Sequence, residues 1–116
     1  MAKKFVCLAD IESIRVPYST FNAALKELSK FGEIVSCKFY GYSGKRTRDY
    51  AEFIEENSYE ALAPLSGKRR GQLDMRQVID AVQLSQSSNI DGFFLIYGQG
   101  DLTPLIAYLK AFNLEV

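Results

Sequence analysis

The sequence predicts one domain over residues 1–116 that folds as a three-layer α/β/α sandwich around a mainly parallel sheet. Apolar runs at 5–9, 34–40 and 92–97 have the length and composition of strands buried on both faces. Segments with helical spacing of apolar residues separate these runs, and such alternation is typical of right-handed βαβ units. A chain of 116 residues also falls within the usual size range of one domain.

The first third of the chain predicts two strands joined by a helix. The run at 5–9 ends at Asp10, where the first strand is expected to stop. Ser19 is the predicted N-cap of the following helix. Gly32 stands where a left-handed residue commonly ends a helix, and the strand at 34–40 follows it.

The middle of the chain predicts a short helix over 49–56 and a weak strand over 59–65. Because Pro64 lacks an amide donor, this strand is expected at an edge of the sheet. A longer helix is predicted from Asp74, with an inward stripe at helical spacing that consists of Met75, Val78, Ile79 and Val82.

The C-terminal part predicts the last buried strand, a turn and a helix. The strand at 92–97 leads through glycines at 98–100 into a helix with apolar residues over 102–109. A further strand is expected to begin at 114–116.

The composition excludes several classes of protein. Fourteen basic and fourteen acidic side chains cancel, so no overall field draws the chain to nucleic acid or membrane. The absence of histidine excludes Ser-His and Cys-His catalysis and a His-ligated zinc. Cys7 and Cys37 lie within apolar runs and are predicted to be buried, reduced thiols. With no secretory signal and no apolar run of about 18 residues, the protein is expected to be cytoplasmic.

Carboxylates stand at the predicted strand ends, where parallel sheets bind ligands. Asp10 follows the first strand, Asp101 follows the last, and Asp74 starts a helix after a basic loop. Clustered carboxylates favour a hard cation such as Mg²⁺ or Mn²⁺, which orients water and neutralises charge during phosphodiester cleavage. Two basic loops would hold the phosphates of such a substrate, through Lys45, Arg46, Arg48, Lys68, Arg69 and Arg70.

Each of these features also has a purely structural interpretation. Asp10 would end its strand in a turn, while Asp74 and Asp101 would cap helices. Asp80, in the middle of a helix, would face solvent, and the basic loops would be solvated. The glycines around Gln99 would form a tight turn. It is the convergence of the carboxylates at strand ends that favours a site.

Four motifs follow one another in an order that resembles a known family. An apolar strand leads into Asp10-Ile11-Glu12-Ser13, and Tyr-Gly-Tyr follows the second strand at 40–42. A Gly-Lys segment at 67–74 runs into a helix with a second aspartate, and the segment 97–105 reads Tyr-Gly-Gln-Gly-Asp-Leu-Thr-Pro-Leu. This order is similar to that of the NYN domains, in the LabA-like branch of the PIN-like nucleases.

The resemblance implies a PIN-like, Rossmann-like topology and a metal-dependent ribonuclease. Asp10, Asp74 and Asp101 match the family's acidic metal-site positions, and Asp80 matches its second helix aspartate. Family members normally continue into a final strand and helix, so the domain is expected to lack these two elements after Val116, either as a natural short form or as part of a longer protein.

The chain departs from the family pattern at four positions. Ser13 stands in place of asparagine, Tyr42 in place of aspartate, and Tyr97 in place of serine. Gln99 replaces an acidic residue of the site, and its amide oxygen carries no charge with which to hold a cation. The departures imply a weakened metal site.

Three hypotheses therefore stand after the sequence alone. The first is a ribonuclease that uses Mg²⁺ or Mn²⁺, held by Asp10, Asp74 and Asp101. The second is a catalytically inactive NYN domain that binds RNA or a protein partner. The third is an oligomerising module, such as a homodimer, that uses apolar surface near the C-terminal segment.

Overall fold

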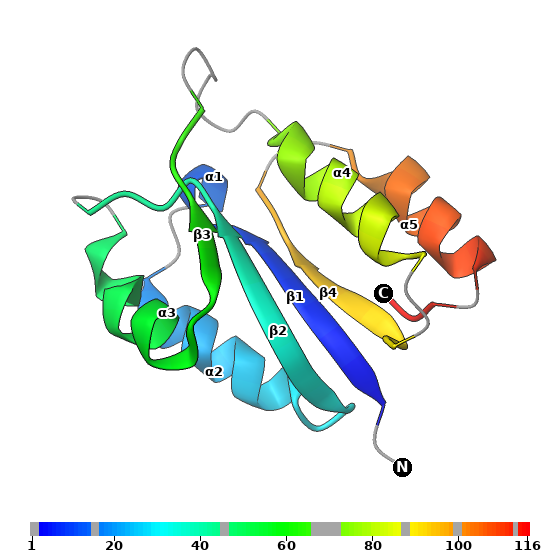
Figure 1. The fold of residues 1–116 in the computed structure, drawn as a ribbon, viewed down its shortest axis with the longest axis horizontal. Helices are drawn as coiled ribbons and strands as arrows, with labels where there is room; N and C mark the ends of the chain where they lie inside the picture. Colours follow the sequence, from blue (N-terminus) through cyan, green and yellow to red (C-terminus); the bar gives the residue numbers. More distant parts are fainter. Residues whose placement is uncertain are drawn as a thin grey trace.

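Strands and helices alternate along the chain, as the sequence predicts. The computed structural model describes residues 3–14, 17–44, 47–65, 73–86, 89–98, 101–112 and 114–116, with backbone alone at 13 and 14. The elements are β1 (Lys4–Asp10), α1 (Ile11–Ile14), α2 (Tyr18–Leu28), β2 (Glu33–Tyr40), the 3₁₀ helix η1 (Arg48–Tyr50), α3 (Ala51–Asn57), β3 (Glu60–Leu62), α4 (Met75–Leu84), β4 (Gly92–Ile96) and α5 (Thr103–Ala111) (Figure 1).

The four described strands form one parallel sheet in the order β3-β2-β1-β4. The chain moves outward from β1 through β2 to β3 and then returns to place β4 on the other side of β1. The order therefore reverses between β1 and β4, and ligands of open α/β sheets bind at the carboxyl end of such a crevice. In the register of β1 and β2, Asp10 lies beside Tyr40.

Helices cover both faces of the sheet, which confirms the predicted three-layer sandwich (Figure 1). Successive side chains of a strand point to opposite faces. Val6 and Leu8 of β1 accordingly belong to the core beneath α4 and α5. Cys7 and Ala9 belong to the core beneath α2 and α3, which is rich in aromatic rings. Both cysteines are buried free thiols, as predicted.

The first long helix begins and ends earlier than predicted. Its N-cap is Pro17 rather than Ser19, and its C-cap is Ser29 in a right-handed conformation. Gly32 therefore does not end the helix. It allows a close approach instead, because a Cβ atom there would lie 2.6 Å from the carbonyl oxygen of Lys3 and 2.6 Å from the ring of Phe5.

The predicted inward stripe of α4 is partly wrong. Met75 and Ile79 are 55% and 53% exposed, whereas Gln77 and Ala81 are the buried residues of this helix. Gln77 turns inward because its amide donates hydrogen bonds to two strand carbonyl groups. Apolar spacing alone therefore misplaces the buried face by part of a turn.

The remaining element predictions hold with small shifts. The strand predicted over 59–65 is the short edge strand β3, and the helix predicted over 49–56 is η1 followed by α3. Glu115 forms a single parallel bridge to Gly92, where a further strand was expected to begin. None of the helices within the described ranges is long and apolar enough to cross a membrane.

Candidate acidic site at the carboxyl edge of the sheet

Asp10 is the last residue of β1 and is almost completely buried, with 1% of its surface exposed. The apolar run of β1 therefore ends in a carboxylate that lies under the surface of the domain. Burial of a charged group is costly unless other groups compensate for the lost water. Such a position at a strand end is characteristic of a functional site.

Asp74 is the N-cap of α4 and is fully buried. Its extended backbone precedes the helix, and its Oδ1 atom accepts a 3.0 Å hydrogen bond from the backbone amide of Arg76. The predicted cap is therefore present. It satisfies one of the helix amides that would otherwise lack a partner.

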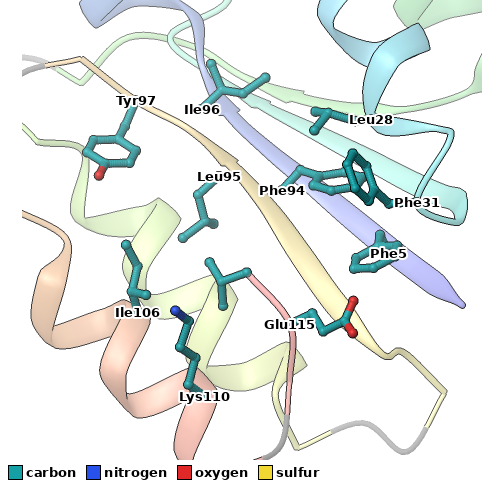
Figure 2. A pocket seen from close by; sticks show the side chains of 11 residues that line it. Phe5, Leu28, Phe31, Phe94, Leu95, Ile96, Tyr97, Ile106, Lys110 and Glu115 are labelled. Atoms are coloured by element: carbon teal, nitrogen blue, oxygen red, sulfur yellow. The ribbon is translucent and has the colours of Figure 1, made fainter.

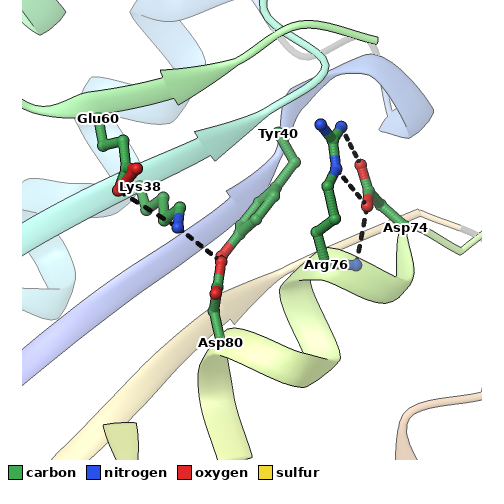
Figure 3. A network of polar contacts seen from close by, with 6 residues as sticks. All are labelled: Lys38, Tyr40, Glu60, Asp74, Arg76 and Asp80. Carbon is green, nitrogen blue, oxygen red and sulfur yellow. Dashed lines mark hydrogen bonds and ion pairs between the residues drawn. The ribbon is translucent and has the colours of Figure 1, made fainter. Parts of the chain in front are cut away.

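The Arg76 guanidinium also binds the Asp74 side chain (Figure 3). Its Nε atom donates to Oδ1 over 3.0 Å, and Nη2 donates to Oδ2 over 2.7 Å. Nη2 further donates to the backbone oxygen of Ala63 over 2.8 Å. The hydrogen bond to Asp74 raises the pKa of Arg76, with smaller contributions from other groups that include the charge of Asp10. The guanidinium thus pairs with the buried Asp74 carboxylate.

Gln77 joins the two strands on either side of the crevice. Its Nε2 atom donates to the carbonyl oxygens of Leu8 in β1 and Ile96 in β4, over 2.9 and 3.0 Å. Its Oε1 atom is buried and has no hydrogen-bond partner within the described part of the chain. Sequence reasoning missed both Gln77 and Arg76. The available signal was a pair of polar residues, two and three positions after the capping aspartate.

Asp80 belongs to a polar network between α4 and the sheet (Figure 3). Its Oδ2 atom accepts a 2.7 Å hydrogen bond from the Tyr40 hydroxyl and lies 2.8 Å from Nζ of Lys38. Lys38 also pairs with Glu60 of β3 at 3.2 Å. Burial, and then the hydrogen bond to Asp80, raise the pKa of Tyr40 far above its ordinary value. Asp80 thus neither faces open solvent nor bonds to the Asp74 pair.

Asp101 is exposed in front of α5. Its Oδ1 atom accepts a 2.9 Å hydrogen bond from the backbone amide of Thr103, the first residue of that helix. Hydrogen bonds from Thr103 lower the pKa of Asp101. Asp101 thus satisfies the first amide of α5, as its structural interpretation predicts, although the N-cap itself is Leu102. Within the described ranges it forms no metal-holding group with Asp10 and Asp74.

The other predicted site positions are only partly described. Tyr42 is half-buried and packs against the aromatic core, and Arg48 is exposed at the start of η1. The remaining predictions lie outside the described residues, and these are the Ser13 side chain, Lys45, Arg46, Lys68, Arg69, Arg70 and Gln99.

An apolar cavity of about 590 Å³ flanks β4 (Figure 2). Phe94 and Leu95 reach it from opposite faces of the strand, and Phe5 stacks on Phe94 with ring centroids 4.7 Å apart. Neither Asp10 nor Asp74 lines this cavity. It is therefore a feature separate from the acidic edge.

The acidic side chains give a limited donor set for a metal. Within the described ranges, no three Asp, Glu, Cys or His side chains form a group able to hold an ion. Asp10 and Asp74 nevertheless supply two buried carboxylates. Mg²⁺ commonly binds through one or two carboxylates, with water and substrate phosphates completing its octahedron. The two residues fit a hard cation of this kind. The positive charge of Arg76, which pairs with Asp74, would weaken its binding.

The domain is an open parallel α/β sheet with buried aspartates at the end of β1 and at the start of α4, and ligands of such sheets bind at the switch point. The sequence model of the NYN domain matches residues 4–116, nearly the whole chain, and the protein therefore belongs to the NYN domain family. This family lies within the PIN-like nuclease superfamily, whose members generally use divalent metals. Comparison with curated proteins and with solved structures gives no significant match.

Proposed function

We propose that this NYN domain hydrolyses phosphodiester bonds of RNA with Mg²⁺ or Mn²⁺, at a site weakened by the family's lost carboxylates. The observation that supports the proposal is the burial of Asp10 and Asp74, one at the end of β1 and one at the start of α4. Two buried carboxylates cost stability, and such a cost is typical of functional positions. Their place near the β1–β4 switch point is where this fold class binds ligands.

In this proposal the residues divide into two roles. Asp10 and Asp74 hold the cation. The cation, when bound, orients water and stabilises charge on the phosphate. The basic side chains of the two loops, Arg48 among them, hold the flanking phosphates of single-stranded RNA.

Asp10→Asn tests the proposal with little change of shape. We expect the wild-type chain to bind Mn²⁺ and to cleave single-stranded RNA in its presence, and we expect Asp10→Asn to do neither. Asp91→Asn is the matched control, because Asp91 lies at the amino ends of the strands, away from Asp10. It stands just before β4, where it accepts a hydrogen bond from the Lys4 amide. RNA cleavage that persists in purified Asp10→Asn would contradict the assignment.

A second candidate is an inactive NYN domain that binds RNA without cleaving it. The hydrogen bonds from the Arg76 guanidinium to Asp74 favour it, because they occupy a carboxylate that would bind the metal. Loss of the acidic residue at Gln99 points the same way. This candidate predicts RNA binding that a chelator does not weaken. It also predicts weaker binding for the triple variant Lys68→Ala, Arg69→Ala and Arg70→Ala, because phosphate contacts dominate such affinity. Equal binding by the triple variant and the wild type counts against it.

A further inference from the structure

Arg76 already occupies the carboxylate that a metal would need. Three hydrogen bonds join Arg76 to the Asp74 side chain, two to Oδ1 and one to Oδ2. The two from the guanidinium form a fork on both oxygens, which is a strong arrangement for an arginine and a carboxylate. Asp74 is fully buried, so little water competes for these contacts.

A divalent cation and this fork would bind the same two carboxylate oxygens. A carboxylate oxygen offers about two acceptor positions, and Oδ1 already receives two donors from Arg76. A bound Mg²⁺ ion approaches its oxygen ligands to about 2.0–2.1 Å, closer than any N–H donor. The guanidinium would also repel a dication at that distance. Because the guanidinium binds both oxygens, a cation on either oxygen of Asp74 is set directly against the Arg76 charge.

Arg76 is held in place from its other side as well. Nη2, the atom that binds Oδ2, also donates to the backbone oxygen of Ala63, just beyond β3. The arginine is thus fixed between the end of β3 and the start of α4. A side chain fixed in this way loses little further freedom when it stays on Asp74. The contact with Ala63 therefore stabilises the pairing of Arg76 with Asp74.

We propose that Arg76 and a divalent cation compete for Asp74, so that Arg76 sets the metal concentration at which the acidic site fills. The inference rests on the proposed function and names the residue that regulates it. Removal of the guanidinium removes two hydrogen bonds from the carboxylate and one positive charge from the site. Arg76→Gln should therefore bind Mn²⁺ at least about tenfold more tightly than the wild type.

The test is a calorimetric titration of Mn²⁺ into the purified full chain at fixed pH and salt. Lys26→Gln is the charge-matched control, because Lys26 is an exposed residue of α2 on the opposite face of the sheet. It should change the affinity less than about twofold, since a distant surface charge is largely screened. The double variant Arg76→Gln and Asp74→Asn should lose the gain, which would locate the bound ion at Asp74.

Arg76→Lys provides a second variant in case Arg76→Gln fails to fold. Lysine keeps the charge but not the planar fork, so its affinity for Mn²⁺ should fall between those of the wild type and Arg76→Gln. Circular dichroism checks that each variant is folded. Equal affinity for the wild type and a folded Arg76 variant overturns the inference, and so does an equal gain in Lys26→Gln.

The same titration separates this inference from the proposed function. If the wild type and Arg76→Gln bind Mn²⁺ equally well, competition fails while metal-dependent cleavage stands. If Arg76→Gln binds Mn²⁺ and the wild type binds none at millimolar ion, the competition between Arg76 and the cation is supported. The proposal that the wild-type chain cleaves RNA with a metal then fails. If neither binds, both proposals fail.

Discussion

The Tyr40 hydroxyl donates a 2.7 Å hydrogen bond to the Asp80 carboxylate, 40 residues further along the chain. Tyr40 ends β2 and Asp80 lies in α4, so the bond joins the sheet to the helix that carries Asp74 at its N-terminus. Lys38 completes the arrangement by pairing with the same carboxylate oxygen at 2.8 Å. Asp80 therefore fixes α4 on the sheet.

The first prediction concerns Asp80→Ala, which leaves Lys38 and the Tyr40 hydroxyl without this partner. We expect a loss of about 2–3 kcal/mol in the free energy of unfolding, since the Asp80 side chain is only 19% exposed. Urea titration measures it. Glu27→Ala is the control, because the Glu27–Lys30 pair is about 70% exposed and such pairs contribute little. Equal effects of the two variants would contradict the structural role of Asp80.

The second prediction is a loss of stability in alkali through Tyr40. Its pKa is raised in the folded state, chiefly by burial, so the folded chain keeps a proton that the unfolded chain releases. The contribution of Tyr40 to the free energy of unfolding is complete below about pH 10. It declines as the pH rises further, by up to about 1.4 kcal/mol per pH unit. The raised pKa of Tyr50 acts in the same direction. Tyr40→Phe should therefore reduce the alkaline slope without removing it.

Urea midpoints between about pH 9 and 11.5 measure this slope. Tyr108→Phe is the control, because Tyr108 is 37% exposed on α5. It should leave the slope unchanged. A wild-type chain whose stability is constant across this range would contradict the buried, hydrogen-bonded state of Tyr40.

The third prediction concerns Gly92, where β4 meets the C-terminal segment. A Cβ atom at this position would lie 2.4 Å from the carbonyl oxygen of Glu115 and 2.6 Å from the ring of Phe5. Gly92→Ala must displace the backbone of the segment, which bonds to the Phe93 amide over 2.9 Å. We expect a loss of about 1–3 kcal/mol in unfolding free energy and faster hydrogen exchange at Phe93.

Gly44→Ala is the matched control for Gly92→Ala. Nothing lies within 4 Å of a Cβ atom at Gly44. Alanine there should be neutral or slightly stabilising, since it restricts the unfolded chain. Unchanged exchange at Phe93 in Gly92→Ala would show that Glu115 does not pair with β4 in solution.

Much of the fold follows from local patterns in the sequence. The apolar runs identify the three longer strands because parallel strands are covered on both faces. Pro64 correctly places β3 at an edge. Asp74 is recognisable as an N-cap, since a short polar side chain precedes a helical pattern. These features depend on neighbours in sequence, and local chemistry therefore suffices to predict them.

The arrangement of the site depends on contacts that no local pattern encodes. Asp80 bonds to Tyr40 across 40 residues, and its orientation follows from how α4 packs on the sheet. The inward turn of Gln77 depends on carbonyl groups in two strands, so apolar periodicity misplaced the buried face of α4. Arg76 and Asp74 are close in sequence, yet their pairing was not predicted. A basic residue two positions after an N-cap is usually solvated.

The last prediction concerns Gln77, whose amide nitrogen holds β1 and β4 together beside the acidic edge. Gln77→Glu preserves shape but replaces the donor with an oxygen that faces the carbonyl groups of Leu8 and Ile96. In this fully buried position the free energy of unfolding at neutral pH should fall by about 3 kcal/mol or more, since a charge is buried without a partner. Burial would raise the pKa of the new carboxyl, so the loss should shrink as the pH falls toward about 4.3, where a protonated carboxyl can donate again.

Gln83→Glu, on the exposed face of the same helix, should show neither effect in urea titrations. A Gln77→Glu protein as stable as Gln83→Glu at neutral pH would mean that the amide does not bridge the two strands.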